Sequence, residues 1–365
     1  MNNIKIETVT SVHIGSGNLL YPNMDYVVNK DVIGIIDEKK ILDLIGLNNL
    51  DHWVNSIGKG EHLKGFLQRF APNATMGQYT HRQMTVYLED VTLSANETLK
   101  EQLHDGRGLP YIPGSSIKGA IRTAVLANLA QKNPGQINLG TGRFMAKPVE
   151  RHFFGNDANS DVFRFLQVGD AYFKNEDEIV IRMENLNIRE RQDFWDDSKA
   201  QLIEALIEET DSGLKMKLDT KGYLLAQKKA GVKQIQTLES LDKLFQTINN
   251  HTLSLLQGEL SFWKKYDDED VVQSYLEQIE GLLEDVESCQ ETMGRSCILR
   301  IGHASGWRFI TGGWAEKLPG FTQSIVPTAR PKNHQYASYP FPKSRRLDHD
   351  GYLLGFIKLT QANNE

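Results

Sequence analysis

The spacing of apolar residues changes near residue 193, and this change limits the folds that the chain can adopt. Over residues 193–286, apolar side chains recur three and four positions apart, which is typical of amphipathic helices. We expect the first of these helices around Leu202, Ala205 and Leu206. Before and after this segment, short runs alternate apolar and polar side chains, as strands do. Short strands mixed with helices, without long parallel crossovers, predict an α+β fold.

The strand pattern indicates a first sheet and a C-terminal continuation. Strand-like sequence lies at residues 4–12, 25–28, 32–36, 87–93, 163–173, 179–186, 297–301 and 351–359. The segments 163–173 and 179–186 are interpreted as a strand pair that completes the first sheet. Helices are expected from residue 38 and over residues 117–131, with a loop over 133–147. At 365 residues the chain exceeds one typical domain. We therefore predict an N-terminal domain over 1–190, an acidic helical region over 191–295 and a C-terminal part over 296–365.

Charge is distributed unevenly along the sequence. The net charge is −6, but residues 190–291 contain 22 acidic and 11 basic residues, and the other residues contain 25 acidic and 30 basic ones. An acidic segment is therefore set into a mildly basic frame, which could hold a phosphate backbone. The acidic helix faces are interpreted either as solvated surface or as a docking face for a basic partner.

Composition excludes several classes of protein. No apolar run is long enough to cross a bilayer, and no leader is expected at Met1. Cys289 and Cys297 are too few for a disulfide framework, and with His303 they would make only a poor metal site. We expect a cytoplasmic protein without a membrane contact, a metal or a cofactor.

The stretch from Tyr111 to Arg122 raises a question about charge. Gly114 follows a proline, and Ser115 or Ser116 would be a good N-cap for the helix that comes next. Lys118 and Arg122 then lie close to the helix N-terminus, where cations are unfavourable unless an anion lies beside them. We predict that this anion is an RNA phosphate.

Two further glycine-marked stretches and a basic segment are also candidates for contacts with RNA. The first comprises His13, Gly15, Ser16 and Gly17, and the second lies at residues 300–313. The second supplies Arg300, Gly302, His303, Ser305, Gly306, Trp307 and Arg308, and the basic segment supplies Lys343, Arg345 and Arg346. Cations interleaved with aromatic rings suit single-stranded RNA. The order of residues matches neither a P-loop nor a dinucleotide fingerprint, and simple capped turns remain the alternative.

A catalytic centre is not evident in the sequence. His13 could act as a general base in an RNA cleavage site, with Asp25 shortly after it, but neither residue has a visible partner constellation. We assign no catalytic residue and keep a metal-independent endoribonuclease that acts through His13 as the alternative function.

These three glycine-marked stretches, in this order, resemble the RAMP superfamily of CRISPR-associated proteins. The helix start at residues 112–122 is the most specific of them. The length, the acidic helical region and the ending at residues 341–347 and 355–359 resemble the large RAMP subunit of type III-A (Csm) complexes. That subunit caps the complex at the 3′ end of the guide RNA.

The resemblance implies ferredoxin-like, RRM-related sheets whose glycine-rich loops contact guide RNA. It also implies assembly onto a neighbouring backbone RAMP subunit and support of guide-RNA maturation in antiviral defence. A small helical subunit and recruited trimming nucleases are further partners that it suggests. The backbone subunit of such complexes cuts target RNA with a loop aspartate, but the residues around Asp25 do not reproduce that loop.

Overall fold

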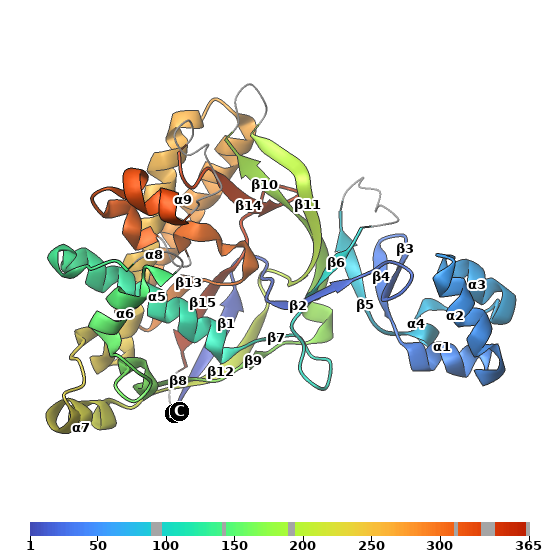
Figure 1. The fold of residues 1–365 in the computed structure, drawn as a ribbon, viewed down its shortest axis with the longest axis horizontal. Coiled ribbons are helices and arrows are strands. Elements are labelled where there is room, and N and C mark those ends of the chain that lie inside the picture. Colours follow the sequence, from blue (N-terminus) through green and yellow to red (C-terminus); the bar gives the residue numbers. More distant parts are fainter. Residues whose placement is uncertain (89–96, 141–143, 189–193, 310–312, 330–339, 363–365) are drawn as a thin grey trace.

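The computed structural model describes residues 1–88, 97–140, 144–188, 194–309, 313–329 and 340–362. Its strands form a five-stranded sheet, an eight-stranded sheet and a two-stranded sheet, with helices packed around them (Figure 1). The predicted α+β class is confirmed.

The five-stranded sheet brings the two ends of the described chain together. Its order is β13 (Ser296–Arg300), β15 (Phe356–Gln361), β1 (Asn2–Thr8), β12 (Asp211–Leu218) and β8 (Leu166–Val168). Ile4 and Ile6 alternate with exposed or half-buried neighbours in β1, as the sequence predicts for a strand with one buried face. The predicted strands at residues 297–301 and 351–359 correspond to β13 and β15, which pair antiparallel.

The eight-stranded sheet contains most of the remaining strands. Its order is β2 (Gly15–Leu20), β6 (Leu99–Gln102), β11 (Trp195–Leu206), β10 (Glu178–Asn187), β5 (Thr80–Tyr87), β4 (Val32–Ile36) and β3 (Tyr26–Asn29), and β14 (Ser344–Asp348) also pairs with β10. The predicted pairing of residues 25–28 with 32–36 is confirmed in β3 and β4. Strand β5 ends where the predicted strand at 87–93 begins, and most of that prediction lies outside the described residues.

Two sequence-based predictions about elements are wrong. The segments 163–173 and 179–186 do not pair, because β8 joins the five-stranded sheet while β10 joins the eight-stranded one. The helix expected around Leu202 is instead the end of strand β11, in which residues 202–206 are all buried. A strand covered on both faces shows no alternation, so its apolar spacing can imitate that of a helix. Strands β11 and β12 thus occupy the first part of the predicted acidic helical region, whose outer boundaries stay a prediction.

The helices of the main body cover the five-stranded sheet. They are α5 (Gly114–Lys132), α6 (Lys147–Phe154), α7 (Thr220–Ala230), α8 (Leu241–Trp263), α9 (Asp270–Glu291) and the short α10 (Val326–Ala329). Strand β13 is buried along its whole length: Cys297 and Leu299 lie in one apolar cluster with α5 and α8, and Ile298 lies in a second cluster with α9. Double coverage explains why Cys297, Ile298 and Leu299 follow one another without a polar residue between them.

Helix α9 places its acidic residues outward. Val272, Ile279 and Val286 are buried on one side of the helix. The exposed carboxylates are Asp270, Glu277, Glu280, Glu284, Asp285, Glu287 and Glu291. The predicted acidic outer face is confirmed for this helix.

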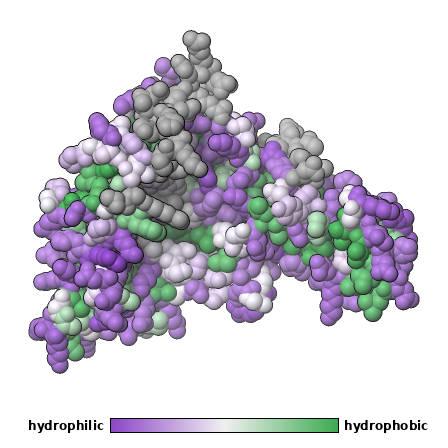
Figure 2. Space-filling model, in the orientation of Figure 1, coloured by the Kyte–Doolittle hydropathy of each residue, from purple (hydrophilic) through white to green (hydrophobic). Residues whose placement is uncertain are grey.

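A helical lobe projects from the edge of the eight-stranded sheet, at the right of Figure 1. It is inserted between β4 and β5 and contains α1 (Glu38–Ile45), α2 (Leu50–Gly58), α3 (Leu63–Phe70) and α4 (Met76–Tyr79). The lobe has its own apolar cluster, which includes Trp53 and Phe66. Figure 2 shows apolar patches on its surface, where Leu47 and Val54 are exposed.

Both cysteines are buried free thiols. Burial raises the pKa of Cys289 and of Cys297. Among the described residues, neither thiol lies in a cluster of potential metal ligands. In the same part of the chain, no helix is both long and apolar enough to span a bilayer.

Candidate nucleic-acid interface

His13 and Gly302 bring two of the glycine-marked stretches together. The amide of His303 donates a hydrogen bond to the carbonyl of His13, at 3.1 Å. Gly302 has a φ of +84°, and a Cβ atom on it would lie 2.5 Å from that same carbonyl oxygen. Only glycine permits so close an approach in this conformation. Gly302 therefore serves a contact between two segments of the protein itself.

A cleft of about 600 Å³ opens beside this contact. Its walls come from β2, β6, β11, the first turn of α5 and the segment after β13. The lining residues are His13, Ile14, Gly15, Gly17, Asn18, Leu19, Thr98, Lys100, Glu101, Ser116, Gln201, Gly302 and His303. All three glycine-marked stretches of the sequence thus contribute to one surface.

Two cations meet at the His303 side chain: Lys100, which lines the cleft, and Arg346, which contacts His303. The Nζ atom of Lys100 lies 3.1 Å from Nε2 of His303. The guanidinium of Arg346 contacts the same ring nitrogen and donates to the His303 carbonyl at 3.2 Å. A neutral imidazole offers one acceptor nitrogen, so it cannot satisfy both donors fully. Within the described residues, no carboxylate forms an ion pair with Lys100 or Arg346.

The electrostatics of this cluster favour a bound anion. Burial, and then the charges of Arg346 and Lys100, lower the pKa of His303 to about 4. The pKa of Lys100 is lowered by burial and then by Arg346. Burial also lowers the pKa of Arg346. All three shifts penalise positive charge, so an anion between these groups would be stabilised. A phosphate oxygen can accept a charge-assisted hydrogen bond from each cation.

Glu101 is the acidic residue of the cleft wall. Its carboxylate accepts hydrogen bonds from Oγ of Ser16 at 2.8 Å and from Nδ2 of Asn18 at 2.9 Å. These bonds fix the start of β2 against β6. The alternative of a simple turn does not hold for this stretch, because Gly15, Ser16 and Gly17 open strand β2.

The imidazole of His13 is buried at the base of the cleft. It is 3% exposed, and its Nδ1 atom lies 2.6 Å from the carbonyl oxygen of Glu204. Burial lowers its pKa to about 4, so the ring is neutral near pH 7. A base this weak is poorly matched to proton abstraction at neutral pH.

A buried ionic network lies below His13. Arg82 donates to Glu178 and to Glu204, at 2.8 Å in each case, and so joins strands β5, β10 and β11. His104 lies close enough to both glutamates for the three side chains to share a metal ion. Arg82 already engages both carboxylates, and it supplies the positive charge that such an ion would supply.

Three arginines predicted to bind RNA are instead bound inside the protein. Arg308 and Arg345 both contact the carboxylate of Glu259, which is fully buried on α8. Burial alone would raise the pKa of Glu259, but Arg345 and Arg308 outweigh it and lower this pKa to about 2. Arg300 is 4% exposed, and its guanidinium carbon lies 4.7 Å from the Phe309 ring centroid. We leave these three arginines out of the interface because their guanidinium groups have internal partners.

The charge question at the start of α5 also has an answer within the chain. Helix α5 begins at Gly114 with Pro113 as its N-cap residue, so the predicted serine N-cap is wrong. The Gly114 amide donates to Asp170 at 2.8 Å. Asp170 is therefore an anion at the helix N-terminus.

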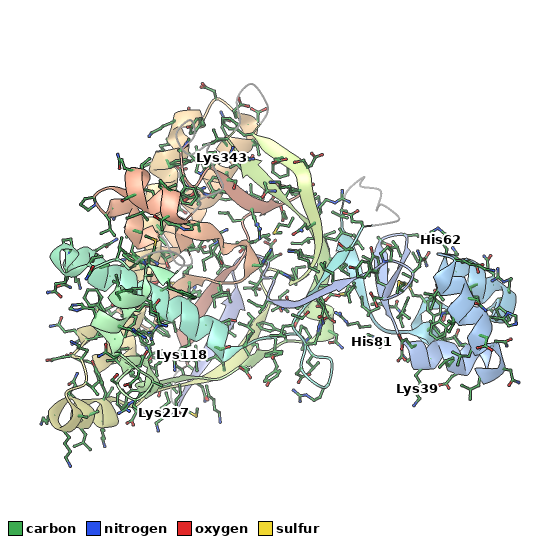
Figure 3. All side chains as sticks on the ribbon, viewed as in Figure 1. Lys39, His62, His81, Lys118, Lys217 and Lys343 are labelled. Atoms are coloured by element: carbon green, nitrogen blue, oxygen red, sulfur yellow. The ribbon has the colours of Figure 1, made fainter. Side chains whose placement is uncertain are left out.

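The two cations of α5 have internal partners as well. Lys118 donates to the carbonyl of Leu166 at 2.7 Å, and Arg122 pairs with Asp161 at 2.8 Å. Figure 3 labels Lys118 beside the first turns of the helix. No RNA phosphate is needed to explain these charges, although Ser116 does line the cleft and Ser115 is exposed.

The remaining predicted residues lie around the cleft or behind it. Ser305 is buried, and its hydroxyl donates to the Gly302 carbonyl. Gly306 is exposed. Trp307 packs between Phe321 and Phe341, and Lys343 is half-buried. Residues 310–312 of the last glycine-marked stretch lie outside the described residues.

Several residues of the cleft were not predicted from sequence, among them Lys100, Asn18 and Gln201. These three belong to no glycine-marked stretch, and they meet because β6 pairs with both β2 and β11. Pairing between distant segments leaves no local signal, so only the fold could identify them.

Comparisons with known proteins agree with this architecture. Residues 5–309 match the family model of the RAMP superfamily. The CRISPR system protein Csm5 of Methanocaldococcus jannaschii is 28% identical over 177 residues, which cover 46% of this chain and 42% of that protein. The match thus spans less than half of that relative.

Two solved structures share the fold over nearly the whole chain. A chain of a Csm–crRNA–target RNA ternary complex from a type III-A CRISPR-Cas system has a TM-score of 0.71 and 19% identity, and the alignment covers 98% of this chain and all of that one. The crystal structure of T. onnurineus Csm5 has a TM-score of 0.63 and 18% identity, with 97% and 99% coverage. The family match, which covers most of the chain, is consistent with the observed α+β architecture. We conclude that this chain belongs to the RAMP superfamily.

Proposed function

We propose that the chain is a Csm5-like, RNA-binding RAMP subunit of a type III-A CRISPR complex and that it binds guide RNA in the cleft beside His303. The observation that carries the proposal is the cluster of Lys100, Arg346 and His303, in which two cations share one neutral acceptor. The similarity to Csm proteins, one of which was solved in a complex with crRNA and target RNA, supports the same assignment.

The finer part of the proposal concerns the place of the subunit in the complex. It would bind the 3′ region of the guide RNA, cap the filament of backbone RAMP subunits and support guide-RNA maturation in antiviral defence. A neighbouring backbone subunit would be its direct partner, and a small helical subunit and trimming nucleases would be further ones. Such a complex would operate in the cytoplasm, where the two buried thiols stay reduced.

The salt dependence of RNA binding tests the proposal. We expect single-stranded guide RNA to bind with a steep dependence on salt, because each neutralised phosphate releases counterions. Lys100→Ala should weaken binding by about tenfold and reduce the slope of log K against log[salt] by about 0.7, the value of one single-strand phosphate contact. Filter binding or fluorescence anisotropy from 50 to 300 mM salt would measure both quantities.

A matched control lies on the helical lobe. Lys39 is an exposed lysine on α1, far from the cleft in Figure 3, and Lys39→Ala should leave affinity and slope unchanged. Equal behaviour of the Lys100 and Lys39 variants would contradict the cleft as the binding site. Absent or salt-independent RNA binding, by the free protein and the assembled complex alike, would refute the function.

A second candidate function is metal-independent RNA cleavage through His13. The observation in its favour is that the rings of His13 and His303 lie 5.9 Å apart in the cleft beside Lys100, since paired imidazoles can act as acid and base. The low pKa of both histidines argues against it. Cleavage of repeat RNA that His13→Ala abolishes while binding persists would establish this candidate, and intact RNA would remove it.

A further inference from the structure

An aromatic stack lies on the two-stranded sheet formed by β7 (Tyr111–Ile112) and β9 (Ala171–Tyr172). Tyr111 and Tyr172 are register partners, and their rings stack with centroids 5.5 Å apart at an interplanar angle of 24°. The guanidinium carbon of Arg107 lies 5.3 Å from the centroid of the Tyr172 ring. Three flat groups thus adjoin one another, and we call them the Tyr–Tyr–Arg stack.

This stack is both accessible and held in place. Tyr172 is 41% exposed, and the side chain of Arg107 is 68% exposed. Asp105 accepts hydrogen bonds from Nε of Arg107 at 2.8 Å and from the Leu109 amide at 3.0 Å, which orders the turn that carries the arginine. A flat ligand would therefore meet side chains that are already oriented, so little conformational entropy is lost on binding.

The chemistry of the stack suits an unpaired nucleobase. Aromatic faces and guanidinium planes are the surfaces on which proteins stack the bases of single-stranded RNA. Base pairs of a duplex are stacked on each other already, so their faces are not available. Two carboxylates lie nearby, and both have partners in the protein: Asp105 pairs with Arg107, and Asp170 accepts from the Gly114 amide and, at 3.4 Å, from the Tyr172 hydroxyl.

Hydrogen bonds connect the stack to the cleft. The Leu103 amide donates to the Ile14 carbonyl at 2.8 Å, and the Tyr111 amide donates to the Leu103 carbonyl at 3.1 Å. Ile14 lines the cleft, and Tyr172 is the next neighbour beyond Tyr111. With about 4.8 Å between neighbouring strands, Tyr172 lies roughly 14 Å from Ile14. A few nucleotides of one RNA strand can span this distance.

Two lysines lie on the adjacent strand β12, and Lys215 is the nearer of them to the stack, because Ser212 of that strand donates to the Tyr172 carbonyl. The Lys215 carbonyl accepts from the Gly169 amide at 2.8 Å, which places Lys215 beside the turn before β9. Lys215 and Lys217 both lie on the exposed face of β12, and Figure 3 labels Lys217 near the end of that strand. In the part of the chain that the structure describes, no carboxylate forms an ion pair with either lysine. Lys215 can therefore neutralise a phosphate near a stacked base.

We propose that the Tyr–Tyr–Arg stack binds an unpaired nucleobase of the same RNA strand whose phosphate lies in the cleft. This inference rests on the proposed function, because it adds a base contact to a phosphate site. Tyr111 and Tyr172 form the platform, Arg107 supplies the outer plane, and Lys215 is available to the adjoining phosphate.

Three substitutions and a modified RNA test the stack. Tyr172→Ala should weaken binding of single-stranded guide RNA by about tenfold, within the range measured for one stacked base, and should leave the salt slope unchanged because no phosphate contact is lost. The conservative Tyr172→Phe should restore most of the affinity. Arg107→Lys keeps the charge but loses the plane, so it should also weaken binding. Tyr87→Ala, which removes another exposed tyrosine, is the neutral control.

An abasic RNA distinguishes stacking from a loss of structure. A single abasic nucleotide at the stacked position should weaken binding as much as Tyr172→Ala does, and the two changes together should cost no more than either alone. If Tyr172→Ala unfolds the protein, Arg107→Lys with the same abasic series gives the answer, because Arg107 lies on an exposed turn.

The outcomes separate this inference from the proposed function. If Lys100→Ala weakens binding and the Tyr172 and Arg107 variants match the wild type, the cleft stands and the stack is overturned. If Tyr172→Ala reduces binding of a partner protein while RNA affinity is unchanged, the stack is a protein contact and the inference is overturned as well. If no RNA binds at all, the proposed function itself fails.

Discussion

At the scale of a single residue, His13 joins parts of the chain that are far apart in sequence. Its carbonyl accepts from the His303 amide, and its ring nitrogen contacts the carbonyl of Glu204. The sequence identifies His13 as unusual because of the glycines that follow it, but it cannot tell a structural imidazole from a catalytic one. Burial favours the structural role, because it lowers the pKa and so the basicity of the ring.

The acid sensitivity of folding should depend on His13. Its pKa of about 4 in the folded protein lies below the usual 6.5, so the unfolded chain binds more protons between these values. The stability present above pH 6.5 is therefore lost as the pH falls towards 4. From pH 7 to pH 5, the wild type should lose about 2 kcal/mol more unfolding free energy than His13→Asn. Urea denaturation at both pH values measures this difference.

His13→Asn retains a side-chain N–H donor for the Glu204 carbonyl and cannot titrate. Other titrating groups are shared by both proteins, so they cancel in the comparison. Parallel pH profiles for the two proteins would mean that His13 is not held neutral by burial.

At the scale of elements, α5 shows that cations near a helix N-terminus can have their partners within the protein itself. Gly114 is required there, because a Cβ atom on it would lie 2.1 Å from the Val168 carbonyl oxygen. The close approach of β8 lets Lys118 reach Leu166 and Asp170 reach the first amide of the helix. The partners of Lys118 and Arg122 are 28 to 48 residues away along the chain.

Arg122 should contribute to stability and not to RNA binding. It pairs with Asp161, and its guanidinium carbon lies 4.3 Å from the Phe154 ring centroid. Arg122→Ala should lower the free energy of unfolding by about 1 kcal/mol, as expected for a partly exposed ion pair with a cation–π contact. Its salt slope for RNA should equal that of the wild type. Lys132→Ala, at the exposed end of the same helix, should change neither quantity, and a shallower slope for Arg122→Ala would restore the RNA role predicted from sequence.

Elements with one buried face could be predicted from the sequence, whereas burial on both faces misled the assignment of β11. The stripe of α5 that includes Ile117, Ile121 and Ala124 is buried as expected, and β3 and β4 pair as expected. Strand β11 escaped prediction because residues 202–206 are buried on both faces. The cleft was predictable only in part: His13 and Gly302 have glycine signatures, whereas Lys100 depends on the pairing of three distant strands.

At the scale of the whole molecule, Glu259 ties the helical layer to the C-terminal strands. Its carboxylate, on α8, contacts Arg308 after β13 and Arg345 on β14, and it accepts from the Tyr275 hydroxyl of α9 at 2.9 Å. The sequence marks both arginines as basic residues near aromatics, which fits an RNA-binding segment equally well. No feature of the sequence around Glu259 indicates that its carboxylate pairs with these two arginines.

Removal of this carboxylate should destabilise the whole fold. Glu259→Gln leaves two buried arginines without their shared counter-charge, which typically costs about 3–5 kcal/mol when a buried pair is broken. We expect a loss of at least about 3 kcal/mol in unfolding free energy, measured by urea denaturation at pH 7. Glu277→Gln, on the exposed face of α9, should stay within about 0.5 kcal/mol of the wild type. A loss below 1 kcal/mol for Glu259→Gln would show that the fold does not depend on the charge of Glu259 beside Arg308 and Arg345.

The position of β15 between β13 and β1 also has a consequence for synthesis on the ribosome. Strand β1 is made long before residues 357–361, with which one of its two edges pairs. That edge stays open until those residues have left the exit tunnel. Pairing between such distant segments is slow to form, and exposed strand edges invite aggregation in the meantime. The five-stranded sheet therefore stays open beside β1 until β15 has been made.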